Sequence, residues 1–156
     1  MILFLDYDGV LHYDDVLVRD DSPILYNPCC TLFQWVDPLI DALAPHPHVK
    51  IVLSTSWVGV FGYDRALAAL PEALRQRVIG ATYTDTDQGW YSKTRYQQIA
   101  EHVEKHQIPR WLAIDDDVIG WPDDQRQALV ECSSWFGLSQ PETQVELRDA
   151  LTRMSL

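Results

Sequence analysis

Residues 2–11 of the chain read ILFLDYDGVL, an apolar run followed by two aspartates and a glycine. Four apolar residues in a row predict a strand that is buried on both faces, as in a parallel sheet. Asp6 and Asp8 point the same way if the strand continues, because side chains along a strand alternate between its faces. Like charges this close repel each other, so we expect a hard divalent cation to compensate them. Gly9 then permits a sharp turn.

Apolar runs alternate with amphipathic segments along the rest of the chain. Further strands are predicted at residues 49–53, 78–82, 110–114 and 128–132, with half of a short hairpin at 16–18. Helices are predicted at residues 36–44, 64–70, 72–77, 93–106 and 140–154. Alternating strands and helices are typical of a parallel sheet with right-handed crossover connections. We therefore expect an α/β fold, formed by a single domain over residues 1–156.

The composition limits the classes of function. The chain has 156 residues, of which 47% are hydrophobic, and its formal net charge is −11. This charge argues against broad electrostatic capture of nucleic acid, although a local basic groove remains compatible with it. No apolar stretch reaches the about 20 residues of a membrane helix, and no secretion signal is seen, so we expect no membrane partner. Three cysteines without a CxxC pair favour a reducing compartment, hence a cytoplasmic location.

Polar residues follow three of the predicted strands. The first strand ends in Asp6 and Asp8, the second in Ser-Thr-Ser at 54–56, and the fourth in three aspartates at 115–117. In an open α/β sheet, ligands bind outside the carboxyl ends of the strands. Core packing alone does not explain reactive groups at the same end of three apolar strands, so we expect a ligand site there.

These residues resemble the motifs of the haloacid dehalogenase (HAD) superfamily of phosphohydrolases. The first motif resembles DYDGVL at residues 6–11, and the second resembles Ser54 after its strand. The third resembles Lys93 at the start of a predicted helix, and the fourth resembles Asp115-Asp116. All four occur in the order that the superfamily has.

A narrower similarity is carried by residues 53–57, 114–117 and 137–139, which resemble the HAD domain of RNA-repair proteins. The resemblance implies a three-layer, Rossmann-like fold with a parallel five-stranded sheet and helices on both faces. The segment from His12 to Gln34 is too short for a full cap domain, so we expect minimal or no cap, with a small flap near residues 16–18.

The resemblance also implies catalytic roles. Asp6 would be the nucleophile that forms an aspartyl-phosphate, and Asp8 would be first the general acid and then the general base. Ser54 would hydrogen-bond a phosphoryl oxygen, and Lys93 would neutralise charge on the transferring group. Thr55 would join them in binding the substrate.

Gly9 is also expected to bind the substrate, at the turn after the first motif. The implied cofactor is Mg²⁺, held by Asp6, Asp8, Asp115 and Asp116, with Asp8 contributing its backbone carbonyl. Whether Asp115 or Asp116 is the direct ligand stays open.

Three functions remain in competition. The leading hypothesis is a Mg²⁺-dependent phosphatase that hydrolyses a phosphomonoester. The second is a nucleic-acid end (3′ or 5′) phosphatase in RNA repair, and the third is a non-catalytic regulatory domain that binds phosphate. Trp57, Trp90 and Tyr91 either stack on a base or pack against the protein. The expected ligand is thus a phosphorylated small molecule or a nucleic-acid end, and the sequence identifies no partner protein.

Overall fold

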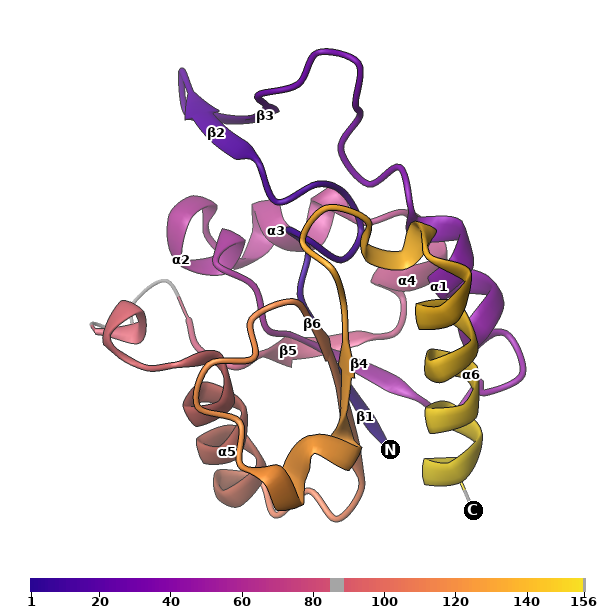
Figure 1. Ribbon diagram of the computed structural model, residues 1–156. Helices are drawn as coiled ribbons and strands as arrows, with labels where there is room; N and C mark the ends of the chain where they lie inside the picture. The colour runs from indigo at the N-terminus through magenta and orange to yellow at the C-terminus, as the bar shows by residue number, and fades with distance from the viewer. Residues whose placement is uncertain (85–88, 156) are drawn as a thin grey trace.

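The computed structural model describes residues 1–84 and 89–155. Within these residues, five strands form a parallel sheet in the order β5-β4-β1-β6-β7 (Figure 1). The strands are β1 (Ile2–Leu5), β4 (Lys50–Leu53), β5 (Val78–Ala81), β6 (Trp111–Asp115) and β7 (Leu129–Glu131). The first strand therefore lies in the centre of the sheet, between β4 and β6. The predicted parallel α/β fold is confirmed.

Side chains along the central strand alternate between two apolar cores. Leu3 and Leu5 belong to the core that is shared with α1 (Val36–Leu43), α3 (Tyr63–Ala69), α4 (Glu72–Arg75) and α6 (Pro141–Ser155). Phe4 belongs to the other core, to which α5 (Arg95–Lys105) contributes Ile99. Figure 1 shows α1 and α6 on one side of the sheet and α5 on the other. Helices thus cover both faces, as predicted.

Helix α5 begins two residues later than the sequence pattern predicts. The Thr94 hydroxyl accepts a hydrogen bond from the Gln97 backbone N–H at 3.2 Å, and the Gln97 side chain accepts one from the Thr94 backbone N–H at 2.9 Å. This reciprocal capping box fixes the helix start at Arg95. Lys93 consequently lies before the helix, whereas Arg95 lies in its first turn.

Four short segments were not predicted. Helix α2 (Trp57–Phe61) is too short for a helical period to be recognised in the sequence. Three short 3₁₀ helices complete the set: η1 (Trp90–Ser92), η2 (Asp123–Ala128) and η3 (Gly137–Ser139). Because η2 extends to Ala128, strand β7 is shorter than the strand predicted at 128–132.

A hairpin projects beyond the carboxyl ends of the strands (Figure 1). It consists of β2 (Val16–Arg19) and β3 (Ser22–Leu25), which pair antiparallel, as expected for a small flap. Arg65 of α3 holds the hairpin turn, with its Nη1 2.7 Å from Asp21 Oδ2. Among the described residues, no helix has the length and apolar character that crossing a bilayer requires.

Candidate active site

The register of the sheet brings three of the predicted site residues to the same level. Leu5 of β1 is paired with Leu53 of β4 on one side and with Ile114 of β6 on the other. The next residue of each strand segment is Asp6, Ser54 or Asp115. Three distant segments therefore meet at the carboxyl edge of the sheet, where ligands of open α/β sheets bind.

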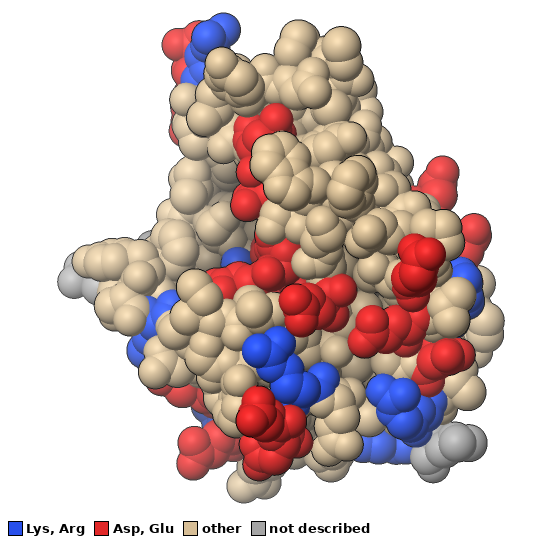
Figure 2. Space-filling view, viewed as in Figure 1, with Lys and Arg blue, Asp and Glu red and all other residues tan. Residues whose placement is uncertain are grey.

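Three carboxylates gather at this edge. Asp6, Asp115 and Asp116 each offer an oxygen atom, and these atoms lie within 4.8 Å of one another. Asp6 is 4% exposed and Asp115 is 1% exposed. Figure 2 shows acidic side chains gathered in the hollow below the hairpin. The structure thus brings Asp115 to the first-strand carboxylate, as the sequence predicts.

Gly9 makes room for one of these carboxylates. Its φ of +69° lies in the left-handed region, and a Cβ atom built there would be 2.3 Å from Asp116 Oδ2. Any other residue at this position would be strained and would also displace Asp116. Gly9 therefore allows the loop after β1 to lie directly against Asp116.

Burial and crowding disfavour the charged forms of the cluster. Burial raises the pKa of Asp115 well above its usual value, and the neighbouring Asp6 raises it further. Burial also raises the pKa of Asp6, although Arg95 lowers it, and burial raises the pKa of Asp116. A bound cation would relieve this cost. The donor set is oxygen alone, which fits the preference of Mg²⁺.

Arg95 lies between the two most deeply buried carboxylates. Its Nε atom is 3.0 Å from Asp115 Oδ2, its Nη2 atom is 3.4 Å from Asp6 Oδ2, and its side chain is 12% exposed. Burial alone would lower the pKa of Arg95, but Asp6 and Asp115 raise it above its usual value, so the guanidinium stays charged. Sequence reasoning missed this residue. The Thr94–Gln97 capping box was the signal that would have found it.

Lys93 takes a different place from the one predicted. Its ammonium pairs with Glu101 at 2.5 Å, and its side chain is 45% exposed. Among the described residues, the cation that contacts Asp6 and Asp115 is Arg95. The difference follows from the helix cap, which leaves Lys93 outside α5 and points the first helical residue into the site.

Two buried hydroxyl groups follow β4. Ser54 is fully buried, and its Oγ atom has no hydrogen-bond partner among the described residues. A buried polar atom without a partner is costly, so Ser54 is suited to meet an oxygen of a ligand. Thr55 is also fully buried, and its Oγ1 atom accepts a hydrogen bond from the Trp57 backbone N–H at 3.4 Å.

The Asp8 side chain does not join the cluster of three carboxylates. Its Oδ1 atom lies 2.9 Å from His12 Nε2 and 2.9 Å from Trp57 Nε1. Its predicted contact with the cation runs through the backbone carbonyl, and this stays a prediction. Trp57 is thus a buried partner of Asp8, while Tyr91 is exposed.

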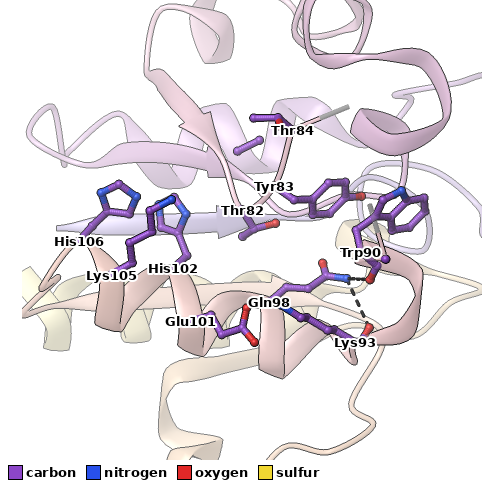
Figure 3. Close-up of a pocket in the computed structure, with 12 residues that line it drawn as sticks. Thr82, Tyr83, Thr84, Trp90, Lys93, Gln98, Glu101, His102, Lys105 and His106 are labelled. Carbon is purple, nitrogen blue, oxygen red and sulfur yellow. Dashed lines mark hydrogen bonds and ion pairs between the residues drawn. The ribbon is translucent and has the colours of Figure 1, made fainter. Parts of the chain in front are cut away.

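A groove of about 580 Å³ lies beside the carboxylates, although these do not line it. Tyr83 and Trp90 form one part of its wall, with their rings stacked 5.0 Å apart (Figure 3). Lys105, the last residue of α5, and His106, which follows the helix, lie further along it. Tyr83 also donates a hydrogen bond to the Thr55 backbone carbonyl at 2.6 Å. The groove therefore begins next to the carboxylate site.

A parallel sheet with acidic and hydroxyl groups at the carboxyl ends of neighbouring strands defines a Rossmann-like α/β protein with its ligand site at that edge. Residues 2–143 match the family model described as the HAD domain in Swiss Army Knife RNA repair proteins. The chain belongs to this family, and membership implies hydrolase-type activity. No curated protein and no solved structure matches the chain significantly.

Proposed function

We propose that the protein is a Mg²⁺-dependent phosphomonoesterase that works through an aspartyl-phosphate on Asp6. The observation that carries the proposal is the common level of Asp6, Ser54 and Asp115 at the sheet edge, with Arg95 between the two carboxylates. This arrangement combines a nucleophile, a hydroxyl donor, a fixed cation and oxygen ligands, which are the elements that phosphoryl transfer needs.

In the first step, a carboxylate oxygen of Asp6 attacks phosphorus and the bond to the leaving oxygen breaks. Asp8 gives its proton to that oxygen, so the product leaves as an alcohol and Asp8 becomes a carboxylate. The Ser54 hydroxyl donates to a phosphoryl oxygen. Arg95 offsets negative charge on the nucleophile and on the transferring group, a role that the sequence assigned to Lys93.

In the second step, Asp8 takes a proton from water, and the water oxygen attacks the phosphorus of the aspartyl-phosphate. The acyl phosphate bond breaks, which releases inorganic phosphate and restores the Asp6 carboxylate. Asp8 is again protonated. One difficult displacement is thereby divided into two easier ones.

Asp6, Asp115 and Asp116 would hold the Mg²⁺ ion, with the Asp8 backbone carbonyl as a further ligand. A bound Mg²⁺ ion supplies charge compensation between the anionic nucleophile and the anionic phosphate. The crowded carboxylates, whose pKa values burial raises, support this assignment. Oxygen ligands and retained waters are what Mg²⁺ prefers.

The test is hydrolysis of 4-nitrophenyl phosphate with Mg²⁺ and with the ion removed by a chelator. We expect turnover that needs the ion and that is lost in Asp6→Asn, a substitution that keeps the side-chain shape. The thermal midpoint of both proteins serves as the control for folding. A wild-type rate no higher than that of Asp6→Asn would contradict the proposal.

A second candidate substrate is the phosphorylated end of a nucleic acid. The family description refers to RNA repair proteins, and the groove beside the site is lined by aromatic and basic side chains, together with Glu101, which is paired with Lys93. Basic groups that follow a backbone and aromatic faces that stack on bases are the usual means of binding a single strand. Turnover of 3′- or 5′-phosphorylated oligonucleotides is compared with that of the matching mononucleotides. Equal kcat/KM values would argue against this substrate.

A further inference from the structure

The contacts around Asp8 differ from those around the other carboxylates. His12 Nε2 and Trp57 Nε1 both lie 2.9 Å from Asp8 Oδ1. The other oxygen, Oδ2, has a longer contact, 3.5 Å from the Ser56 hydroxyl. One oxygen of Asp8 is therefore held by two ring nitrogens, while the second is held only weakly.

The hydrogen-bond partners of the His12 ring determine which nitrogen carries the hydrogen. The Phe33 backbone N–H donates to His12 Nδ1 at 3.3 Å. Because Nδ1 accepts this bond, the hydrogen of the neutral ring resides on Nε2, which then donates to Asp8. Trp57 Nε1 is a donor in every state. Asp8 Oδ1 thus faces two N–H groups.

Packing keeps both rings in place. His12 is fully buried and Trp57 is 4% exposed. Phe33 contacts both rings edge to face, with centroids 4.9 Å from His12 and 5.3 Å from Trp57. The backbone on either side of these rings is also tied together, because the Trp35 N–H, close to Phe33 in the sequence, donates to the carbonyl of Leu11, the residue before His12. Such rings do not turn away from Asp8 without repacking the core.

We propose that His12 and Trp57 are positioning residues for Asp8: they bind Oδ1 and so leave Oδ2 as the oxygen that exchanges the proton with the leaving group and with water. A proton on Oδ1 would meet two N–H donors, which makes that position unfavourable. This inference rests on the proposed function, in which Asp8 is the general acid and base. It adds that the acid is pre-oriented by two residues to which neither the sequence pattern nor the resemblance assigned a catalytic role.

Leaving groups of different basicity separate this role from a structural one. In 4-nitrophenyl phosphate the leaving group departs as an anion, whereas in glycerol 2-phosphate it needs a proton. Trp57→Phe keeps the aromatic shape and removes the N–H. We expect it to lower kcat/KM for glycerol 2-phosphate about tenfold and kcat/KM for 4-nitrophenyl phosphate less than about threefold. The reason is that only the glycerol leaving group needs the proton that Asp8 supplies as general acid.

The kcat values are expected to behave differently from kcat/KM. Both substrates form the same aspartyl-phosphate, and its hydrolysis needs Asp8 as base. Where that step limits turnover, Trp57→Phe lowers kcat for both substrates by a similar factor, so KM for 4-nitrophenyl phosphate falls as well.

His12→Gln, which retains an N–H donor, is expected to recover most of the activity that His12→Leu loses.

Trp121 provides the matched control. It is 5% exposed, its Nε1 atom has no hydrogen-bond partner among the described residues, and it packs in the core on the opposite face of the sheet. Trp121→Phe makes the same change without touching Asp8. The ratio between the kcat/KM values for the two substrates should therefore stay as in the wild type. Equal losses of kcat/KM on both substrates in Trp57→Phe would overturn the positioning role.

A measurement that does not depend on activity separates this inference from the proposed function. The indole N–H proton of Trp57 is observed by NMR in the wild type and in Asp8→Ala. We expect that resonance to move upfield when Asp8 is removed, while the Trp121 resonance stays in place. An unmoved Trp57 resonance would refute the contact even in an inactive protein. A moved resonance with no hydrolysis of either substrate would refute the proposed function and the catalytic part of this inference.

Discussion

The strands β1, β4 and β6 differ sharply from the residues that follow them. Leu5, Leu53 and Ile114 are fully buried and apolar. One residue further along, Asp6, Ser54 and Asp115 are buried almost as deeply, yet they are polar or acidic. The sheet therefore passes from pure core to a charged site within a single residue.

This difference separates stability from function along the same strands. Burying apolar area stabilises the fold by roughly 25 cal/mol per Å². Burying a carboxylate costs free energy, and the pKa values of Asp6 and Asp115, which stay raised although Arg95 lowers them, show that this ion pair offsets the cost only in part. We conclude that the strand bodies supply the stability that allows their ends to hold an unfavourable but reactive arrangement.

The largest effect is expected for Asp115→Asn, which tests whether the strand ends serve function at the expense of stability. Removing this charge takes away a cation ligand, so kcat/KM for 4-nitrophenyl phosphate should fall about a thousandfold. The metal-free variant should also melt a few degrees higher than the wild type, at about 2–4 °C for each kcal/mol. A variant that is less stable without metal would contradict the comparison.

The next effect concerns the cation of the site. Arg95→Met should lower kcat/KM about a hundredfold, because it removes the positive charge between Asp6 and Asp115. Lys93→Met, its matched control, should change kcat/KM less than about threefold, because an exposed ion pair contributes little. Steady-state kinetics on the two variants shows which of the two residues supplies the positive charge. A larger loss in Lys93→Met than in Arg95→Met would return this role to Lys93, as the sequence suggested.

Leu112→Ala addresses the strand bodies. Leu112 is fully buried in the core that also contains Leu3 and Leu5. Its truncation should lower the free energy of unfolding by about 2 to 5 kcal/mol, because it removes apolar contact and leaves a cavity. Urea denaturation measures this loss, and the activity per folded molecule should stay near that of the wild type. A large loss of kcat in the folded fraction would mean that body and end are not separable.

The smallest effect is expected in the pH dependence of stability. Burial raises the pKa of Asp14 to about 6 and also raises those of Asp6, Asp115 and Asp116. The folded metal-free protein therefore holds protons that the unfolded chain, with aspartate pKa values of about 4, has already lost. The contribution of these carboxyl groups to the stability of the metal-free protein should be fully present below about pH 4. It should be lost as pH rises through 6.

Differential scanning fluorimetry from pH 4.5 to pH 8, with and without Mg²⁺, measures this slope. We expect the ion to raise the thermal midpoint more at pH 8 than at low pH, because protons compete with it for the carboxylates. Asp115→Asn should flatten the slope of the metal-free protein. A midpoint that rises with pH in the metal-free wild type would show that the carboxylate cluster is not the source of the cost.

Much of the sheet was predictable because its strands are short apolar runs with polar ends. The strand at residues 2–5, the meeting of Asp6 with Asp115, and the positions of Ser54 and Gly9 all follow from that pattern and from the resemblance. Parallel strands bring their carboxyl ends together, so sequence order alone is enough to place these residues at one edge.

Arg95 and the partners of Asp8 were not predictable in the same way. Arg95 instead of Lys93 depends on which residue follows the Thr94 cap, and a shift of two residues on a helix rotates the side chain to another face. His12 and Trp57 meet at Asp8 through a loop and a five-residue helix, where no period exists to indicate direction. Local geometry, rather than pattern, decides such contacts.

The contact between Gly9 and Asp116 has a consequence for how the sequence can change. The space that a methyl group at position 9 would fill is already taken by the Asp116 carboxylate. The two positions are thus tied together in substitution: a library at position 9 should return glycine alone while Asp116 is kept. A smaller side chain at position 116 removes the collision but not the left-handed backbone, so asparagine and aspartate, which tolerate that backbone better than most residues, are the substitutions expected at position 9. The absence of a side chain at position 9 thereby limits which residues can stand at position 116, although the two are distant in the sequence.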